Sequence, residues 1–301
     1  MIRFLKHIDI DKTRWDECVK KSANGNVYAL SHYLDIVHPQ WEALVSDDYE
    51  AVMPLPSKSR FRISYLFTPF FVQQLGIFSP KKLNINDIDK FIENIPDKFK
   101  AISLRLNEGN FFDGLRDTVN HRNIILPLND DVATLRGNYH DNLRRNIKQA
   151  ENNNVELIYD IDTEVVINLF RKNRGKSVTH WGDAEYAVLK RLPFAFVIGA
   201  KVGGNVEAGA CFLEFGDRIT FIFSGSSEIG KKQHLLAYIL DAVVKKYAGT
   251  GKILDFEGSD DDNLARFYLG FGGRAVLYPE LKANRGKFIT KILINKKLST
   301  K

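Results

Sequence analysis

The chain has 301 residues, of which 44% are hydrophobic and 27% are charged, and its formal net charge is +6. This length suits two lobes with separate cores, and the composition is that of an ordinary globular protein. The charge is mild, since 43 basic residues face 37 acidic ones. It permits an anionic ligand such as a phosphate, a coenzyme or RNA without requiring one.

Neither cysteine usage nor apolar runs point to secretion or a membrane. Cys18 and Cys211 lie far apart and match no metal spacing, so we expect buried, reduced thiols. The opening residues "MIRFLKHIDIDK" contain no apolar signal region, and no apolar run approaches the roughly 20 residues that a membrane span needs. The sequence therefore predicts a cytoplasmic protein with no transmembrane segment.

The first half predicts a mixture of strands and helices. Residues 43–55 predict a hairpin around Ser46, Asp47 and Asp48, because turn residues separate two apolar runs. Hydrophobic periodicity and turn signals then predict, in chain order, strands at 62–67 and 71–78, a helix at 85–95, a strand at 101–107, a helix at 111–122 and a strand at 123–128.

The second half shows the same kinds of element more clearly. A helix is predicted at 138–154, followed by a three-strand antiparallel meander at 194–202, 206–215 and 218–225. The period then changes, and apolar residues at helical spacing predict one helix from near Ser227 to near Gly249. The remaining predictions are a strand at 252–257, a short helix at 263–273 and strands at 275–281 and 288–295.

Both halves therefore repeat the order hairpin strands, helix, strand, helix, strand. This repetition favours a duplicated α+β fold, although chance similarity between two α+β halves is the alternative. The stretch 128–138 has low hydrophobicity and is the natural junction. We expect an N-terminal unit at 1–132 and a C-terminal unit at 133–301, each with a mixed sheet flanked by helices.

Several stretches resemble known acyltransferases. The order of the second half resembles the GNAT superfamily of N-acetyltransferases, and "RFYLGFGG" is similar to the corner that ends a helix there. Two such units in tandem resemble the FemABX-like aminoacyltransferases. The stretches that carry this resemblance are "WDECVKKSANGNVYALSHYLD", "VMPLP", "NLRRNIKQAENNNVEL" and "LDFEGSDDDNLARFYLGFGG".

The resemblance implies a donor site where the third meander strand separates from the strand that follows it. Unpaired backbone groups at such a point can bind an extended pantetheine arm or peptide as an added strand. An anion is favoured at the following helix start, with simple N-capping by Ser226 or Ser227 as the alternative. The predicted donor-binding residues are Ser224, Gly225, Ser226, Gly230, Lys231, Lys232 and Gln233.

The departure of this loop from the GNAT pattern bears on the donor. Coenzyme-binding GNAT loops carry Gln or Arg three positions before a Gly, and Gly or Ala two positions after it. Here Ser227 and Lys232 occupy those outer positions around Gly230. The departure disfavours acetyl-coenzyme A and is better tolerated by the Fem-type relatives, which need no pyrophosphate cradle.

Acyl transfer to an amine needs a group that accepts a proton. Alternation along the strand at 252–257 places Asp255 and Glu257 on one face, where two carboxylates suit a general base. Helix capping or simple solvation of these carboxylates is the alternative. Tyr238 is the third candidate catalytic residue, with Tyr268 and His234 as other proton carriers.

Two further groups are candidates for binding an acceptor or an anion. Arg144, Arg145 and Lys148 lie within about one helical turn and would clamp phosphates, or else form a solvated helix face. Gln73 and Gln74 would line a cleft in the first unit, or else form a polar strand edge.

The leading hypothesis is an N-acyltransferase that moves an acyl or aminoacyl group to the amine of a small molecule or peptide, such as a cell-envelope precursor. Acyl-coenzyme A or aminoacyl-tRNA would be the co-substrate, and no tightly bound cofactor, metal or DNA partner is expected. The Fem enzymes that use tRNA commonly carry a long helical arm inserted in the second unit, and its absence from this sequence counts against a tRNA donor. The alternative is a binding protein that kept the fold without catalysis.

Overall fold

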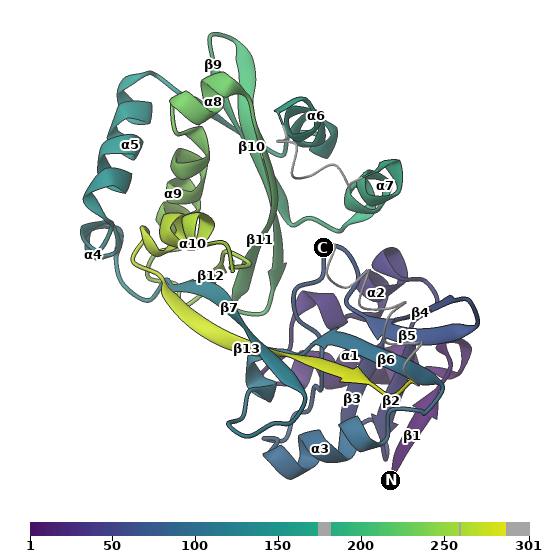
Figure 1. Cartoon of the computed structure of the whole chain (residues 1–301). Helices are drawn as coiled ribbons and strands as arrows, with labels where there is room; N and C mark the ends of the chain where they lie inside the picture. The colour runs from purple at the N-terminus through teal and green to yellow at the C-terminus, as the bar shows by residue number, and fades with distance from the viewer. Residues whose placement is uncertain (174–181, 259, 287–301) are drawn as a thin grey trace. The chain divides into compact units, whose positions relative to one another are not determined.

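The computed structural model describes residues 1–173, 182–258 and 260–286. The described chain divides into two compact units, one formed by Met1–His121 together with residues 277–286, the other by Arg122–Val276 (Figure 1). The divisions fall inside strands β7 (Thr118–Pro127) and β13 (Arg274–Asn284). Most of β13, from Leu277 on, therefore belongs with the first compact unit. A sequence duplication with its boundary at 132/133 stays a prediction.

The first unit begins with a small antiparallel sheet of order β1-β2-β3. Its strands are β1 (Ile2–Leu5), β2 (Glu42–Ser46) and β3 (Ala51–Leu55). The β2-β3 pair is the hairpin predicted at 43–55. Trp15 of α1 (Lys12–Lys21) and Trp41 are fully buried beside the sheet, with ring centroids 4.7 Å apart. Two large rings in van der Waals contact anchor this core.

A second group of strands completes the first unit. It contains β4 (Ser57–Arg60), β5 (Ile63–Phe67), β6 (Phe99–Arg105) and the C-terminal part of β13. β5 runs parallel to β6, and β13 pairs antiparallel with β6 from Glu280 opposite Arg105 to Asn284 opposite Ala101. The unit also contains helices α2 (Ser31–Val37) and α3 (Ile85–Glu93), the latter at the position predicted from its periodicity.

Two predictions for the first half are wrong. The expected strand at 71–78 is an irregular segment, because side chains of Asn107 and Asn110 bond its backbone where a neighbouring strand would. The expected helix at 111–122 does not form either. Gly114 and Asp117 have φ of 87° and 53°, which no α-helix accommodates, and β7 begins immediately afterwards.

The second unit is built on a mixed sheet. The C-terminal part of β7 lies beside β12 (Ile253–Asp255), followed by β11 (Arg218–Ser226), β10 (Asn205–Phe215), β9 (Phe196–Val202) and β8 (Glu156–Tyr159). The β9-β10-β11 meander is as predicted, with antiparallel pairing throughout.

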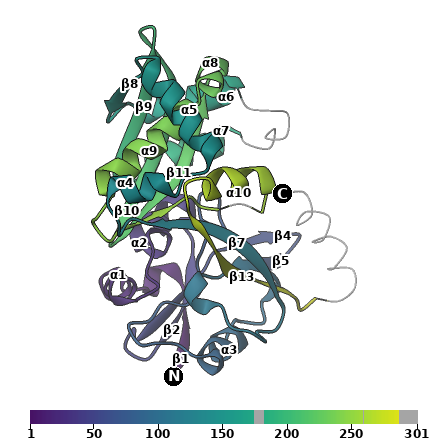
Figure 2. The ribbon, with the colours of Figure 1, turned by 90° about the vertical axis from the view of Figure 1, so that its left-hand side faces the viewer.

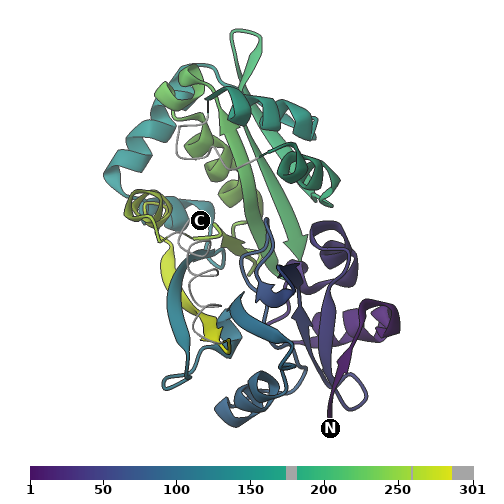
Figure 3. The same cartoon turned by 45° about the vertical axis from the view of Figure 1, so that its right-hand side comes forward.

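Helices cover both faces of this sheet, as Figures 1 and 3 show. One face carries α4 (Val132–Gly137), α5 (Asp141–Asn152), α9 (Leu235–Tyr247) and α10 (Asp262–Leu269), and Figure 2 shows this side of the unit. Leu143, Ile147 and Ala150 of α5 pack into its apolar core, as the predicted helix at 138–154 requires. The opposite face carries α6 (Thr163–Asn173), with α7 (Asp183–Arg191) beside it.

The long helix predicted from Ser227 to Gly249 is divided in two. A short helix, α8 (Glu228–Lys232), is followed by Gln233 and then by His234 at φ 56°, a left-handed conformation that breaks the hydrogen-bond ladder before α9. Helices α6 and α7 were not predicted. The strand expected at 288–295 lies outside the described residues.

Both cysteines are buried free thiols, as predicted. Burial raises the pKa of Cys18 to about 11 and that of Cys211 to about 12. Within the described ranges, no helix has both the length and the apolar character needed to cross a membrane.

Candidate functional site

Strands β11 and β12 of the second unit separate, as the sequence analysis expected. Their parallel pairing ends at Thr220 and Asp255, after three residue pairs. The next residue, Phe256, donates its backbone N–H to Ile124 of β7 at 3.0 Å. Gly258 then lies so close to β7 that a Cβ would come within 2.3 Å of Asn123 Cα. β12 therefore follows β7 while β11 continues along β10, and we call this point of separation the fork.

The distal part of β11 is shaped by a β-bulge. Its register with β10 shifts between Cys211 and Phe212, which turns Phe223 toward α6, where its ring lies 5.0 Å from that of Phe170. Gly225 also contacts α6, and a Cβ there would lie 2.3 Å from the backbone oxygen of Val166. Of the predicted donor residues on this strand, Gly225 therefore provides close helix packing.

Ser224 and Ser226 are the remaining predicted donor residues on β11. Both are half-buried, and both alternate with Gly225 along the strand. Alternation directs their side chains to the sheet face opposite α6. They are the hydroxyls of β11 nearest the end of the separated segment.

The helix start after β11 is occupied by contacts within the protein. Ser227 caps α8 by accepting the N–H of Gly230 at 3.0 Å, and its hydroxyl bonds the carboxylate of Glu207. A Cβ on Gly230 would lie 2.2 Å from the backbone oxygen of Glu207. At this helix start the geometry is that of N-capping by Ser227, which was the alternative to anion binding. An anionic ligand at this position would face the carboxylate of Glu207.

The other predicted residues of this loop differ in their surroundings. Lys231 pairs with Glu228 at 2.7 Å, while Lys232 is exposed. Gln233 ends α8, and its Oε1 is buried with no hydrogen-bond partner among the residues that the structure describes. Buried acceptors in folded proteins normally receive a hydrogen bond, so this oxygen is an exception among the described residues.

At the fork, Asp255 forms a buried ion pair. Its Oδ2 lies 2.6 Å from Nη1 of Arg218, and its Oδ1 accepts the backbone N–H of Glu257 at 2.8 Å. The side chain is only 3% exposed. Both carboxylate oxygens of Asp255 are therefore already occupied by contacts within the protein.

Glu257 lies beyond the end of β12, so the predicted alternation does not extend to it. Its backbone adopts φ 53°, and the side chain is half-buried. Its neighbour Phe256 is buried and stacks on Tyr268 at 5.0 Å. Burial, and secondly the charge of Glu257, raise the pKa of Tyr268, so that this tyrosine stays protonated near neutral pH.

Tyr238 lies on α9 beside an ionic network that the sequence analysis missed. Lys245 lies 5.9 Å from its ring centre and forms an ion pair with the fully buried Asp241 at 3.0 Å. Asp241 also contacts Arg136 Nε at 3.2 Å and the hydroxyl of Tyr139 at 3.1 Å. The available signal was an aspartate among the apolar residues of a buried helix, where a charge requires partners.

Two of the three predicted anion-binding residues line a pocket of about 460 Å³ in the second unit. Arg144 and Lys148 share this pocket with Arg136 and Glu151, whereas Arg145 bonds its own helix through Asn142. Arg136 and Glu151 form an ion pair at 3.0 Å. Three cations of this pocket thus come from α4 and α5, and Arg145 is not among them.

Gln73 and Gln74 are buried in the first unit, with 5% and 3% of their surface exposed. Gln74 donates to Gln73 Oε1 at 2.8 Å and accepts the backbone N–H of Glu108 at 2.9 Å. These hydrogen bonds hold the irregular segment at 71–78, so neither amide lies on a cleft surface.

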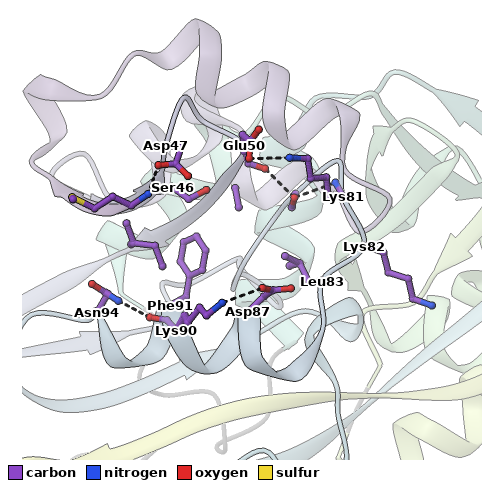
Figure 4. Close-up of a pocket in the computed structure, with 14 residues that line it drawn as sticks. Ser46, Asp47, Glu50, Lys81, Lys82, Leu83, Asp87, Lys90, Phe91 and Asn94 are labelled. Carbon is purple, nitrogen blue, oxygen red and sulfur yellow. Dashed lines mark hydrogen bonds and ion pairs between the residues drawn. The ribbon is translucent and has the colours of Figure 1, made fainter.

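The first unit has a separate pocket of about 580 Å³, shown in Figure 4. Several of its charged groups are paired with one another: Lys81 with Glu50 at 2.9 Å, and the N-terminal ammonium of Met1 with Asp47. No predicted site residue lies in it. Across the residues that the structure describes, no cluster of three or more His, Cys, Asp or Glu side chains is arranged to hold a metal ion.

Comparison with known proteins identifies the fold. No protein-family model matches the sequence, and no curated protein is similar to it in sequence. The structure of FemX is 13% identical, covers 95% of this chain and 98% of its own, and has a TM-score of 0.68. L-PGS from Bacillus licheniformis is 12% identical with a TM-score of 0.56, covering 95% of this chain and 96% of its own.

A conserved protein of unknown function from Bacteroides thetaiotaomicron also matches. It is 11% identical, covers 94% of this chain and 99% of its own, and has a TM-score of 0.59. These matches extend over nearly the whole chain and confirm the predicted fold class. The chain therefore has a FemABX-like α+β fold, shared with FemX and L-PGS.

Proposed function

We propose that the protein is an N-acyltransferase that moves an aminoacyl group from an aminoacyl-tRNA to an amine. The observation that carries the proposal is the fork between β11 and β12, since it leaves the distal edge of β11 beyond the pairing with β12. An extended donor chain is recognised by such an edge through backbone hydrogen bonds. The similarity to FemX and L-PGS supports this class of fold.

The choice of an aminoacyl donor follows from the start of α8. A coenzyme pyrophosphate needs free backbone N–H groups and no opposing charge. Here the N–H of Gly230 is bonded to Ser227, and Glu207 lies against the same serine. An aminoacyl ester needs no such cradle, and in the choice of donor this point outweighs the missing helical arm.

Glu257 is the proposed general base. The amine nitrogen of the acceptor attacks the ester carbonyl carbon, the new amide bond forms, and the ribose oxygen leaves as the hydroxyl. The amine proton passes to the carboxylate of Glu257, which is half-buried, and from there to the leaving ribose oxygen. Asp255 then has a positioning role, because it accepts the backbone N–H of Glu257.

The pocket on α4 and α5 is the proposed anion subsite for a phosphate of donor or acceptor. Its candidate residues are Arg144, Lys148 and Arg136. Replacing Arg144 and Lys148 by Gln should raise KM about tenfold or more while kcat stays constant, since ground-state and transition-state binding are weakened equally. Arg145→Gln is the matched control on the same helix and should change neither constant.

Transfer from labelled donors tests the main proposal. Purified protein is given aminoacyl-tRNA or acyl-coenzyme A with a library of amines, and amide products are measured by mass spectrometry. Product from aminoacyl-tRNA supports the proposal, and product from the thioester alone overturns the donor assignment. Absence of product with both donors favours the alternative of a binding protein that retained the fold.

The role of Glu257 is tested by substitution. Glu257→Gln should lower kcat by about 10² to 10⁴ without changing the unfolding temperature, as expected for loss of a general base. Glu228→Gln, at an exposed carboxylate of α8 in the same unit, is the control and should keep full activity. Unchanged kcat in Glu257→Gln would rule out the base assignment.

A further inference from the structure

The hairpin of β4 and β5 in the first unit has an unusual tip. Arg60 pairs with Ile63, so that Phe61 and Arg62 form a two-residue loop. Phe61 is 70% exposed, and Lys58, Arg60 and Arg62 around it are exposed as well. The alternation of cations and a ring in "KSRFR" was the sequence signal for this feature.

The backbone of the two-residue loop is left-handed, a conformation that Phe and Arg rarely adopt. Phe61 and Arg62 have φ of 50° and 62°, the left-handed region that a tight hairpin loop requires at both positions. Asn and Gly are the residues that adopt it readily, whereas a bulky aromatic side chain does so at a steric penalty. A loop that keeps Phe and Arg here sacrifices stability, which is typical of positions used for binding.

The two guanidinium charges of the tip are available to a ligand. In the part of the chain that the structure describes, no carboxylate forms an ion pair with Arg60 or Arg62. The guanidinium of Arg60 lies 5.0 Å from the ring centre of Phe61, and Lys58 Nζ lies 4.3 Å from that of Phe67. The tip thus presents a ring and a planar cation together, and both stack on nucleic-acid bases.

Two alternative roles for the tip fit fewer of its residues. Cations on an edge strand deter pairing with other chains, which explains Lys58 and Arg60 but not an exposed ring at the tip. Anchoring to a membrane surface requires several apolar side chains or a second signal, and Phe61 is the one large apolar residue of this hairpin with a mostly exposed side chain. Base stacking requires a single ring for each base.

We infer that the hairpin tip binds an unpaired stretch of RNA, with Phe61 stacking on a base and Lys58, Arg60 and Arg62 contacting phosphates. The identity of the RNA as the tRNA of the donor rests on the proposed function, whereas the RNA contact itself does not. The inference adds a second substrate contact that lies in the first unit.

Binding of uncharged tRNA tests the inference without any transfer reaction, so its outcome is separate from that of the proposed activity. Fluorescence anisotropy is measured over a range of salt concentrations for the full chain and its variants. Phe61→Ser should raise Kd between about fivefold and 150-fold, the range for loss of one stacked base. Replacing Lys58, Arg60 and Arg62 by Gln should reduce the salt slope by about 0.7 for each phosphate that the protein no longer neutralises.

A variant with a better loop separates binding from folding. Phe61→Asn combined with Arg62→Gly should raise the unfolding temperature, since both residues suit the left-handed backbone, and should weaken tRNA binding at the same time. Lys82→Gln, at an exposed lysine elsewhere in the first unit, should leave Kd unchanged.

Three results would overturn the inference. They are no tRNA binding by the unmodified chain, equal tRNA affinity in the hairpin variants, and sedimentation with vesicles of anionic phosphatidylglycerol that depends on Phe61 while tRNA binding does not. The last result would assign the tip to a lipid surface.

Discussion

Acidification should weaken the first unit through one buried carboxylate. Glu280 of β13 lies 2.7 Å from His121 Nε2 and 3.2 Å from Lys282 Nζ, and it accepts the hydroxyl of Ser103. Burial raises the pKa of Glu280, but the bonds from His121 and Ser103 and the charge of Lys282 lower it more in sum, to about 2. The folded state therefore holds Glu280 ionised far below the pH at which an unfolded chain would protonate it.

The expected magnitude follows from linkage. A pKa of about 2 in the folded state against 4.5 in the unfolded chain stabilises the fold by about 3 kcal/mol at pH 7. Because the folded-state pKa is the lower one, this stability is fully present above pH 4.5 and is lost as pH falls toward 2. By pH 3, about half or more of it should be gone.

Glu280→Gln isolates this contribution, since glutamine resembles the protonated acid. Urea unfolding at pH 7 should show a loss of about 3 kcal/mol, and the gap to the unmodified chain should shrink to about 1 kcal/mol at pH 3. Glu17→Gln is the control, because its partner Lys21 is exposed and the pair contributes little. A gap that stays constant from pH 7 to pH 3 would refute the assignment of the effect to ionised Glu280.

Other consequences of the structure can be measured by urea unfolding. Asp255→Asn removes the carboxylate of the Arg218–Asp255 ion pair and should lower the free energy of unfolding by about 3 kcal/mol. Arg218→Met in the same chain should recover part of this loss, and a coupling near zero would contradict a functioning ion pair. Gly225→Ala places a methyl group against the backbone of α6 and should lower the free energy of unfolding by about 1 to 3 kcal/mol. In Gly137→Ala the new methyl group meets open space in a helix, so this variant should raise the free energy of unfolding by up to about 1 kcal/mol. Asn110→Ala removes two hydrogen bonds to the buried backbone of Ile77 and should lower the free energy of unfolding by about 2 kcal/mol or more. Unchanged stability would show that water replaces these bonds.

Much of the fold was accessible from local patterns. The meander of β9, β10 and β11, the β2-β3 hairpin and helices α3 and α5 follow from periodicity and from turn residues such as Gly203 and Gly204. Such signals act between residues close in sequence, where the chain alone sets the preference. The separation of β11 from β12 was expected through the resemblance to GNAT enzymes, and the pairing bears it out.

Errors arose where local preference and long-range contacts disagree. The segment at 71–78 has the apolar residues of a strand, but Asn107 and Asn110 bond its backbone from more than 25 positions away. Likewise, no local pattern around Asp241 predicts that Arg136 and Tyr139, about 100 positions earlier, contact it in the core.

The sequence by itself determined the α+β class, the order of most elements and the residues near the fork, because side-chain pattern and backbone preference are local properties. Only the tertiary structure decided which contacts each candidate residue makes. It assigned Asp255 to an ion pair, Gly225 to contact with α6, Gln73 and Gln74 to the interior, and Arg144 and Lys148 to one pocket. The physical reason is that burial and charge pairing depend on segments far apart in the chain, which come together only when it folds.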